Sequence, residues 1–202
     1  MRPFAVRGRQ AKTLSEADIR RLLSVATTSN SPKRNRVIVL LSVRAGLRAG
    51  EIAQLEWPMV LDAAGKIGAL VILPGRIVKY GLGRRVPMHR ELRTALVALW
   101  RETRQARGAE RLGPVIRSQR GGAMSAGGIV NWFTEACRAA RLEGCSSHSG
   151  RRTFVTRAAR LVSRAGGSLR DVQQLVGHRS IETTQGYIDG DHDAQRRLVR
   201  MM

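Results

Sequence analysis

The sequence lacks the features that mark secreted, membrane-bound or disulfide-stapled proteins. Only two of its 202 residues are cysteines, and Cys137 and Cys145 form no CxxC pair, which suggests no disulfide framework and fits a reducing cytosol. No apolar run approaches the roughly 20 residues that a membrane-spanning helix needs. The N-terminal stretch MRPFAVRGRQAK is basic but has no apolar centre of the kind found in signal peptides. We therefore expect a cytoplasmic protein with no membrane partner.

Motifs for metals, dinucleotides and serine nucleophiles are missing as well. The four histidines show no HExxH spacing, which disfavours zinc. The segment DGDHD at 189–193 begins like a calcium loop, but Ala194 stands where the obligatory glycine belongs and Arg200 where the bidentate glutamate belongs. GLG at 81–83 leads to no helix, and no G-x-S-x-G elbow occurs. The sequence gives no reason to expect a metal or a cofactor.

Acidic residues are few compared with basic ones. The chain has 36 Lys+Arg against 15 Asp+Glu, a formal net charge of +21. The basic residues are spread along the chain, so the folded surface itself should attract a polyanion, most often a nucleic acid. Only four of them are lysines: Lys12, Lys33, Lys66 and Lys79. The planar guanidinium of arginine can bind two phosphate oxygens at once, which suits a phosphate-rich partner. A GC-rich genome would also favour arginine over lysine. That bias would explain the ratio of arginine to lysine but not the net charge.

Hydrophobic periodicity predicts an α+β domain that is mainly α-helical with one small antiparallel β-sheet. Between Val60 and Met88, β-branched residues between glycines predict two or three short strands with tight turns. Ser15 and Ser168 stand where helix N-caps belong, and Gly46 and Gly177 where helices stop. The expected helices cover residues 13–26, 33–46, 49–57, 89–106, 125–142, 148–163, 168–178, 180–188 and 193–202.

Six polar residues stand beside sharp breaks in these expected elements. They are Arg48, Lys79, His148, Arg151, His178 and Tyr187. The first arginine follows a glycine-terminated helix, the lysine lies in a glycine-flanked hairpin, and His148 and Arg151 are three apart, on one helix face. Taken singly, each has an ordinary structural role, such as a solvated charge, a helix cap or a packed ring.

Together, these residue types match attack on a phosphodiester. Fixed arginine forks neutralise the non-bridging oxygens of the phosphate. A tyrosine hydroxyl, with a pKa of about 10, is a weak nucleophile unless a neighbouring base accepts its proton. The leaving sugar oxygen needs a proton, which a lysine with a lowered pKa can donate. Two arginines, a lysine, two histidines and a tyrosine supply these roles without a metal.

The order of the six residues and the short sequence motifs around them resemble those of the tyrosine recombinases, the phage-integrase family of site-specific DNA recombinases. AGLRAGEIAQLEW resembles the first arginine box of that family and would make Arg48 its catalytic arginine. GRIVKYGLGRRVPM resembles the β-hairpin that carries the catalytic lysine, here Lys79. The match covers roughly residues 13–190.

Two further boxes complete the resemblance. HSGRRTFVTR matches the H-x-x-R box, with His148 and Arg151, and LVGHRSIETTQGYI matches the G-H…T-T…Y box, with His178 and Tyr187. One box alone would be weak evidence, whereas four boxes in family order are specific.

The resemblance implies the catalytic-domain fold of the DNA breaking-rejoining enzymes and a mechanism. Tyr187 would attack a DNA phosphate, with His148 as its base, and leave a 3′-phosphotyrosyl link and a free 5′-hydroxyl. Lys79 would protonate the leaving 5′-oxygen, while the two arginines and His178 would bind the phosphate. Because the covalent link conserves the phosphodiester energy, a second 5′-hydroxyl can reverse the step without ATP.

The resemblance also implies a domain plan and a partner. Residues 1–12 would form a basic N-terminal arm and residues 13–202 the catalytic domain, without the N-terminal core-binding domain that typical members carry. That plan fits a cut-out catalytic domain or a short member such as the fimbrial phase-switch invertases. The partner would be double-stranded DNA at a bacterial or phage nucleoid, with a homo-tetramer assembled on two DNA sites. A monomer in the absence of DNA is left open.

Two residues depart from the pattern of the H-x-x-R box. The family commonly has Asp-Leu between the histidine and the arginine, whereas this chain has Ser149 and Gly150. A glycine inside a helix costs about 1 kcal/mol relative to alanine. We therefore expect a looser local frame around Arg151.

Two other functions are compatible with parts of this pattern. A type IB topoisomerase-like activity would use the same chemistry to relax DNA and would need no pairing of two sites. A catalytically silent DNA-binding regulator would keep the fold and its basic surface. The complete set of six residues argues against the regulator, since a silent descendant has no reason to keep Tyr187.

Overall fold

The computed structural model describes residues 11–107, 113–187 and 199–200. Its α-helices are α1 (Glu16–Thr27), α2 (Pro32–Ala45), α3 (Ala49–Ala53), α4 (Arg90–Arg107), α5 (Ala126–Ala139), α6 (Ser147–Leu161), α7 (Leu169–Val176) and α8 (Ile181–Gln185). Strands β1 (Leu70–Leu73) and β2 (Arg84–Pro87) form a two-stranded antiparallel sheet. The prediction of a mainly helical α+β domain with one small sheet is confirmed.

The ends of several helices follow the capping signals in the sequence. Ser15 and Ser168 each form a capping box at the start of α1 and α7. Gly46 and Gly177 end α2 and α7 in the left-handed conformation, both with φ of 65°. The helix expected at 49–57 is shorter, because α3 ends at Ala53 and a 3-10 turn, Trp57–Met59, follows.

Three expectations fall mainly outside the described residues. They concern the basic arm at 1–12, the polar segment at 189–193 and the terminal helix at 193–202.

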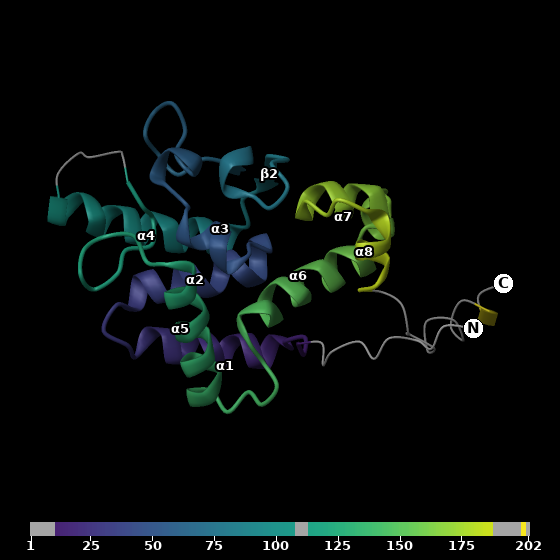
Figure 1. Cartoon of the computed structure of the whole chain (residues 1–202), viewed down its shortest axis with the longest axis horizontal. Helices are drawn as coiled ribbons and strands as arrows, with labels where there is room; N and C mark the ends of the chain where they lie inside the picture. The colour runs from purple at the N-terminus through teal and green to yellow at the C-terminus, as the bar shows by residue number, and fades with distance from the viewer. Residues whose placement is uncertain (1–10, 108–112, 188–198, 201–202) are drawn as a thin grey trace.

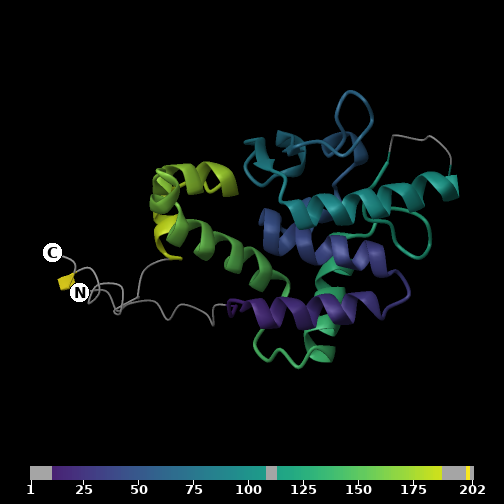
Figure 2. The same cartoon turned by 180° about the vertical axis from the view of Figure 1, so that it is seen from behind.

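Helix α2 is the centre of the main core. It packs against α1, α4 and α6, and Figure 1 and Figure 2 show it with these helices around it. Every residue from 37 to 43, VIVLLSV, is buried. A helical stretch that is buried on all sides must be surrounded by protein, and the neighbouring helices meet that requirement.

The sheet gives the connection between its strands a fixed position. Val71 faces Val86 across the strands, and both are buried. Ile72 points to the exposed face of β1, as expected for alternation along a strand. Arg84 is an exception on β2, because this charged side chain occupies an inward, buried position. The residues between the strands include Lys79.

A second, smaller hydrophobic cluster lies in the C-terminal part. It consists of Val155, Ala159, Val172 and Val176, from α6 and α7, and the ring of Tyr187 packs against it. In Figure 1, α6 runs from the main body toward α7 and α8. The chain therefore has two apolar clusters, and α6 contributes to the connection between them.

Gly150 has a packing role that the sequence did not indicate. A Cβ atom at Gly150 would lie 2.2 Å from Oγ of Ser42 on α2, so the glycine lets α2 and α6 approach each other closely. The start of α6 is also fixed, because the Ser146 N–H donates to Oγ of Ser149 over 3.0 Å. Of the two residues that depart from the family pattern, Gly150 therefore lies at the contact between α2 and α6, and Ser149 accepts a cap hydrogen bond at the start of α6.

We expect Gly150→Ala to destabilise the fold by about 1–3 kcal/mol, because the added methyl group overpacks the contact between α2 and α6. Urea denaturation of the purified variant measures this change. Gly127→Ala on α5 is the matched control, since the nearest atom to its new Cβ lies at 4.0 Å. The control should be neutral or stabilising by up to about 1 kcal/mol. Equal stability of Gly150→Ala and wild type would contradict the close approach.

Candidate active site

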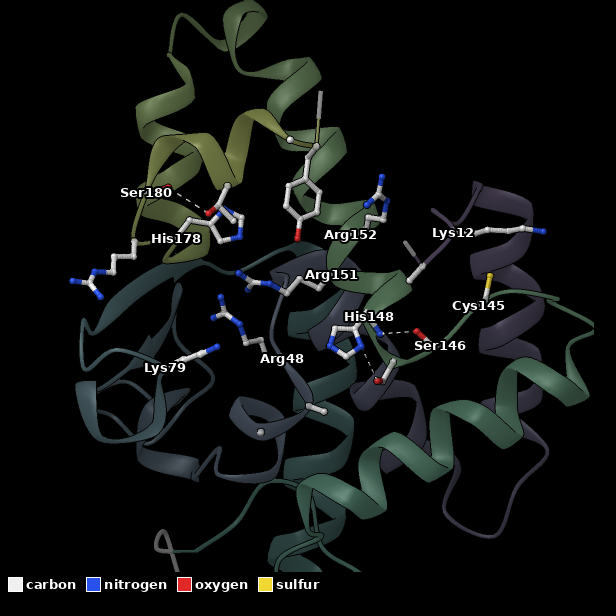
Figure 3. A pocket seen from close by; sticks show the side chains of 18 of the residues that line it. Lys12, Arg48, Lys79, Cys145, Ser146, His148, Arg151, Arg152, His178 and Ser180 are labelled. Carbon is white, nitrogen blue, oxygen red and sulfur yellow. Dashed lines mark hydrogen bonds between the residues drawn. The ribbon is translucent and has the colours of Figure 1, made fainter. Parts of the chain in front are cut away.

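All six residues singled out in the sequence line one cleft. The cleft has a volume of about 1650 Å³ and opens where the start of α3, the β1–β2 connection, the start of α6 and the α7–α8 segment meet. Figure 3 shows Arg48, Arg151 and His178 directed toward a common space, with Lys79 and His148 at its sides. The remaining member, Tyr187, also belongs to the lining. The fold therefore brings together residues from four separate segments of the chain.

Arg151 is fixed by the C-terminal ends of two helices. Its Nη1 donates to the carbonyl oxygen of Gly46 at the end of α2, over 2.5 Å, and its Nη2 to that of Val176 at the end of α7, over 2.9 Å. These carbonyls have no partner within their own helices, and the helix dipoles place partial negative charge there. Burial, followed by the neighbouring Arg48, lowers the pKa of Arg151 to about 10. The buried guanidinium therefore stays charged at neutral pH.

Gly46 has a second reason to be glycine beyond its positive φ. A Cβ atom there would lie 2.4 Å from Cδ1 of Phe154 on α6. The bare backbone allows α6 to approach closely enough for Arg151 to reach the Gly46 carbonyl.

Arg48 is held by a buried carboxylate. Glu51, whose side chain is 2% exposed, accepts the backbone N–H of Arg48 and its Nη1, both over 2.9 Å. The same carboxylate accepts two bonds from Arg84, of 2.9 and 2.8 Å. Burial alone would raise the pKa of Glu51, but the bonds from Arg84 and Arg48 hold the pKa below its ordinary value. Glu51 is therefore an ionised carboxylate between two arginines.

His178 is a neutral, buried ring at neutral pH. Burial, and then the charges of Arg151 and Arg48, lower its pKa from 6.5 to about 4. Its Nδ1 lies 3.0 Å from Oγ1 of Thr184, a fully buried hydroxyl on α8. This bond occupies Nδ1 and leaves Nε2 available for a ligand in the cleft.

The ring of Tyr187 lies between two neighbours. It stacks on the His178 ring at a centroid distance of 5.5 Å, and Cζ of Arg152 lies 5.5 Å from its centroid. Two other members of the lining, His148 and Lys79, lie at the sides of the cleft. His148 lies in the first turn of α6, and Nζ of Lys79 lies 5.0 Å from the Tyr80 ring. The tyrosine is thus held more closely than the lysine.

The charge of the cleft is strongly positive. Among the residues that line it, six are cationic: Lys12, Arg48, Lys79, Arg151, Arg152 and Arg179. Two are acidic, Glu143 and Glu182. In the part of the chain that the structure describes, no three His, Cys, Asp or Glu side chains gather as a metal site. The same part holds no helix that is long and apolar enough to cross a bilayer. The arrangement is suited to a bound anion.

The fold and the cleft agree with a known family. A family model described as Phage integrase family matches residues 12–193. The chain belongs to the phage integrase family. The resemblance inferred from the four sequence boxes is thereby confirmed.

The known proteins that this phage integrase family member resembles are named as recombinases or integrases. Tyrosine recombinase XerC of Xanthomonas axonopodis pv. citri (strain 306) is 30% identical over 179 residues, which are 87% of this chain and 53% of that protein. The crystal structure of XerA recombinase matches with a TM-score of 0.72 at 25% identity, covering 94% of this chain and 64% of that one. The Tn1549 transposon integrase, solved with transposon right end DNA, matches with a TM-score of 0.66 at 20% identity over 94% and 65% of the two chains. The chain spans about half the length of the curated relatives it matches.

Several residues of the site in this family member were not predicted from its sequence. Arg152 lies four positions after His148, and this spacing could have placed both on one helix face. Glu51 stands three residues after the N-cap of α3, where acidic side chains reach back to the backbone. The role of Arg84 had no local signal, because Arg85 is its neighbour and an equal candidate for burial.

The lowered pKa of His178 predicts a loss of stability in mild acid. The unfolded chain takes up a proton near pH 6.5, whereas the folded chain does so only near pH 4, so the free energy of unfolding falls as the pH drops through that interval. We expect His178 to contribute on the order of 2–3 kcal/mol to this decrease. Denaturant titrations from pH 7 to pH 4 measure it, and His178→Gln should flatten the curve between pH 6.5 and 4. An unchanged slope in the variant would contradict a buried neutral ring.

Proposed function

We propose that this protein is a site-specific DNA recombinase that cleaves and rejoins duplex DNA through a covalent 3′-phosphotyrosyl intermediate. The observation that carries the proposal is the single cationic cleft that holds two fixed arginines, a neutral histidine and a packed tyrosine together. The names of the relatives, tyrosine recombinases, and the DNA bound to the transposon integrase support the same activity. DNA integration, excision or inversion would be its outcome.

The scissile phosphate would bind between Arg48, Arg151 and His178. Arg151 uses two N–H groups on helix carbonyls, and the remaining donors of its guanidinium are available to phosphate oxygens. The neutral His178 would donate from Nε2–H while its Nδ1 accepts the hydroxyl proton of Thr184. These donors are in place before the reaction, so they stabilise the negative charge on the non-bridging phosphate oxygens without a further reorganisation cost.

Tyr187 would attack the phosphorus as its hydroxyl proton passes to His148. The new bond from the tyrosine oxygen to phosphorus forms as the bond to the 5′-oxygen breaks, and Lys79 protonates the leaving oxygen. The reverse reaction, with a 5′-hydroxyl from another strand, releases Tyr187 and restores the phosphodiester. Lys79 and His148 are both exposed, which leaves their side chains room to adjust to the DNA.

The DNA partner would be a duplex, and recombination would require four protomers on two sites. The six cations of the cleft lining provide the phosphate contacts. Affinity for the duplex should therefore fall as the salt concentration rises.

Tyr187→Phe should bind DNA but form no covalent adduct, because it lacks only the nucleophilic hydroxyl. The substrate is a pool of nicked suicide duplexes with randomised sequence around the nick, from which covalently captured strands are amplified into a defined substrate. Adducts are counted on a denaturing gel. Tyr80→Phe is the matched control, since Tyr80 is the other tyrosine of the sequence. An adduct with Tyr187→Phe, or its loss only with Tyr80→Phe, would refute the assignment of the nucleophile.

Lys79→Ala should slow adduct formation by about 10²- to 10⁴-fold, the range in which a general acid contributes. A substrate with a 5′-thio leaving group needs no proton, so it should restore most of the rate. The comparison variant is Arg48→Ala, which should stay slow on both substrates because it lacks a phosphate contact. Equal slowing of Lys79→Ala on the oxygen and sulfur substrates would remove Lys79 from the acid role.

A further inference from the structure

Arg84 is a buried charge on a strand where its neighbour is exposed. Its side chain is 5% exposed and points inward from β2, whereas Arg85 points outward. A buried guanidinium is costly unless its charge and donors are matched. Both terminal nitrogens of Arg84 bind the two carboxylate oxygens of Glu51, over 2.9 and 2.8 Å. This paired geometry is the strongest form of an arginine–carboxylate contact.

The position of Arg84 changes the charge that Arg48 presents to the cleft. Glu51 binds Arg48 as well, and these two side chains alone would have no net charge. With Arg84 included, the three side chains carry a net charge of about +1 at neutral pH. Arg84 thereby offsets the carboxylate, so the positive charge of Arg48 is available to an anion.

Arg84 also lies behind the segment that carries His178. A Cβ atom at Gly177 would be 3.1 Å from Cδ of Arg84 and 3.3 Å from its Nη1, so the two residues are in close contact. The same arginine stands five positions after Lys79 on the strand that follows the connection. Arg84 therefore contacts two of the segments that supply the cleft, through Glu51 and Gly177, and directly follows a third, the β1–β2 connection. Among the described residues that line the cleft, Arg84 itself is not present.

We propose that Arg84 is a positioning residue for the phosphate chemistry. Through Glu51 it sets the place and the effective charge of Arg48, and through Gly177 it supports the place of His178, without touching DNA. The proposal rests on the recombinase function proposed above. It predicts that the loss of Arg84 slows the chemical step more than it weakens DNA binding.

The test compares Arg84→Met with Arg85→Met, two adjacent substitutions that each remove one positive charge. Single-turnover adduct formation is measured at saturating concentrations of the selected nicked duplex, and the Kd for that duplex is measured separately. We expect Arg84→Met to lower the saturated rate by about 10²-fold, the size of effect that small misplacements of reacting groups produce. Its Kd should change by no more than Arg85→Met changes it. Arg84→Lys, which keeps the charge but loses the fork, should recover part of the rate.

Glu51→Gln separates positioning from a general loss of structure. If Arg84 acts through Glu51, the double variant Arg84→Met/Glu51→Gln should be about as slow as the slower single variant. Both substitutions disrupt the same ion pair, so their effects should not multiply. All rates are taken at a temperature where circular dichroism shows the variants folded. If Arg84→Met does not fold, the saturated rates and Kd values of Arg84→Lys and Glu51→Gln are compared with those of Arg85→Met instead.

Three results would overturn the inference. They are equal saturated rates for Arg84→Met and Arg85→Met, a defect confined to Kd, and multiplicative effects of Arg84 and Glu51. Absence of an adduct with the wild-type protein would instead refute the recombinase function and the inference together. A wild-type adduct with an unaffected Arg84→Met variant refutes the positioning role alone.

Discussion

The cleft depends on one buried guanidinium that joins the ends of two helices. Arg151 donates to the last turn of α2, in the main core, and to the last residue of α7, in the smaller cluster. The carbonyls at both ends lack partners within their helices, so a single cation meets two separate requirements. The contact requires Gly46 without a side chain, because Phe154 occupies the space of its Cβ. The same interaction therefore connects the two apolar clusters and presents an arginine to the cleft.

Concentrating positive charge in this way has an electrostatic cost that shapes the rest of the site. Burial and nearby arginines lower the pKa of both Arg151 and His178. One ionised carboxylate, Glu51, lies among these charges and is shared by two arginines. Glu51 orients the two arginines, and its single negative charge leaves the net charge of the group positive. A phosphate would relieve the remaining repulsion, which gives the cleft a physical preference for an anion.

The tyrosine shows how packing and chemistry are combined. Its ring packs against the small apolar cluster and stacks on His178, which are ordinary structural contacts. Those contacts also fix the ring beside the arginines. A packed ring and a reactive hydroxyl are therefore compatible at this position, because the apolar contacts hold the ring and leave the role of the hydroxyl to the surrounding polar groups.

The sequence by itself determined the helical character of the chain, several helix ends and the six residues that share the cleft. Capping boxes at Ser15 and Ser168 and the stop at Gly46 are signals within a few residues, so they can be read without tertiary contacts. The four boxes in order identified the family. Only the tertiary structure decided that Arg84 is buried while Arg85 is exposed, that Glu51 lies between two arginines, and that Gly150 is a close contact with α2. The burial of a charge or the space for a Cβ depends on partners from distant segments, and no local pattern encodes them.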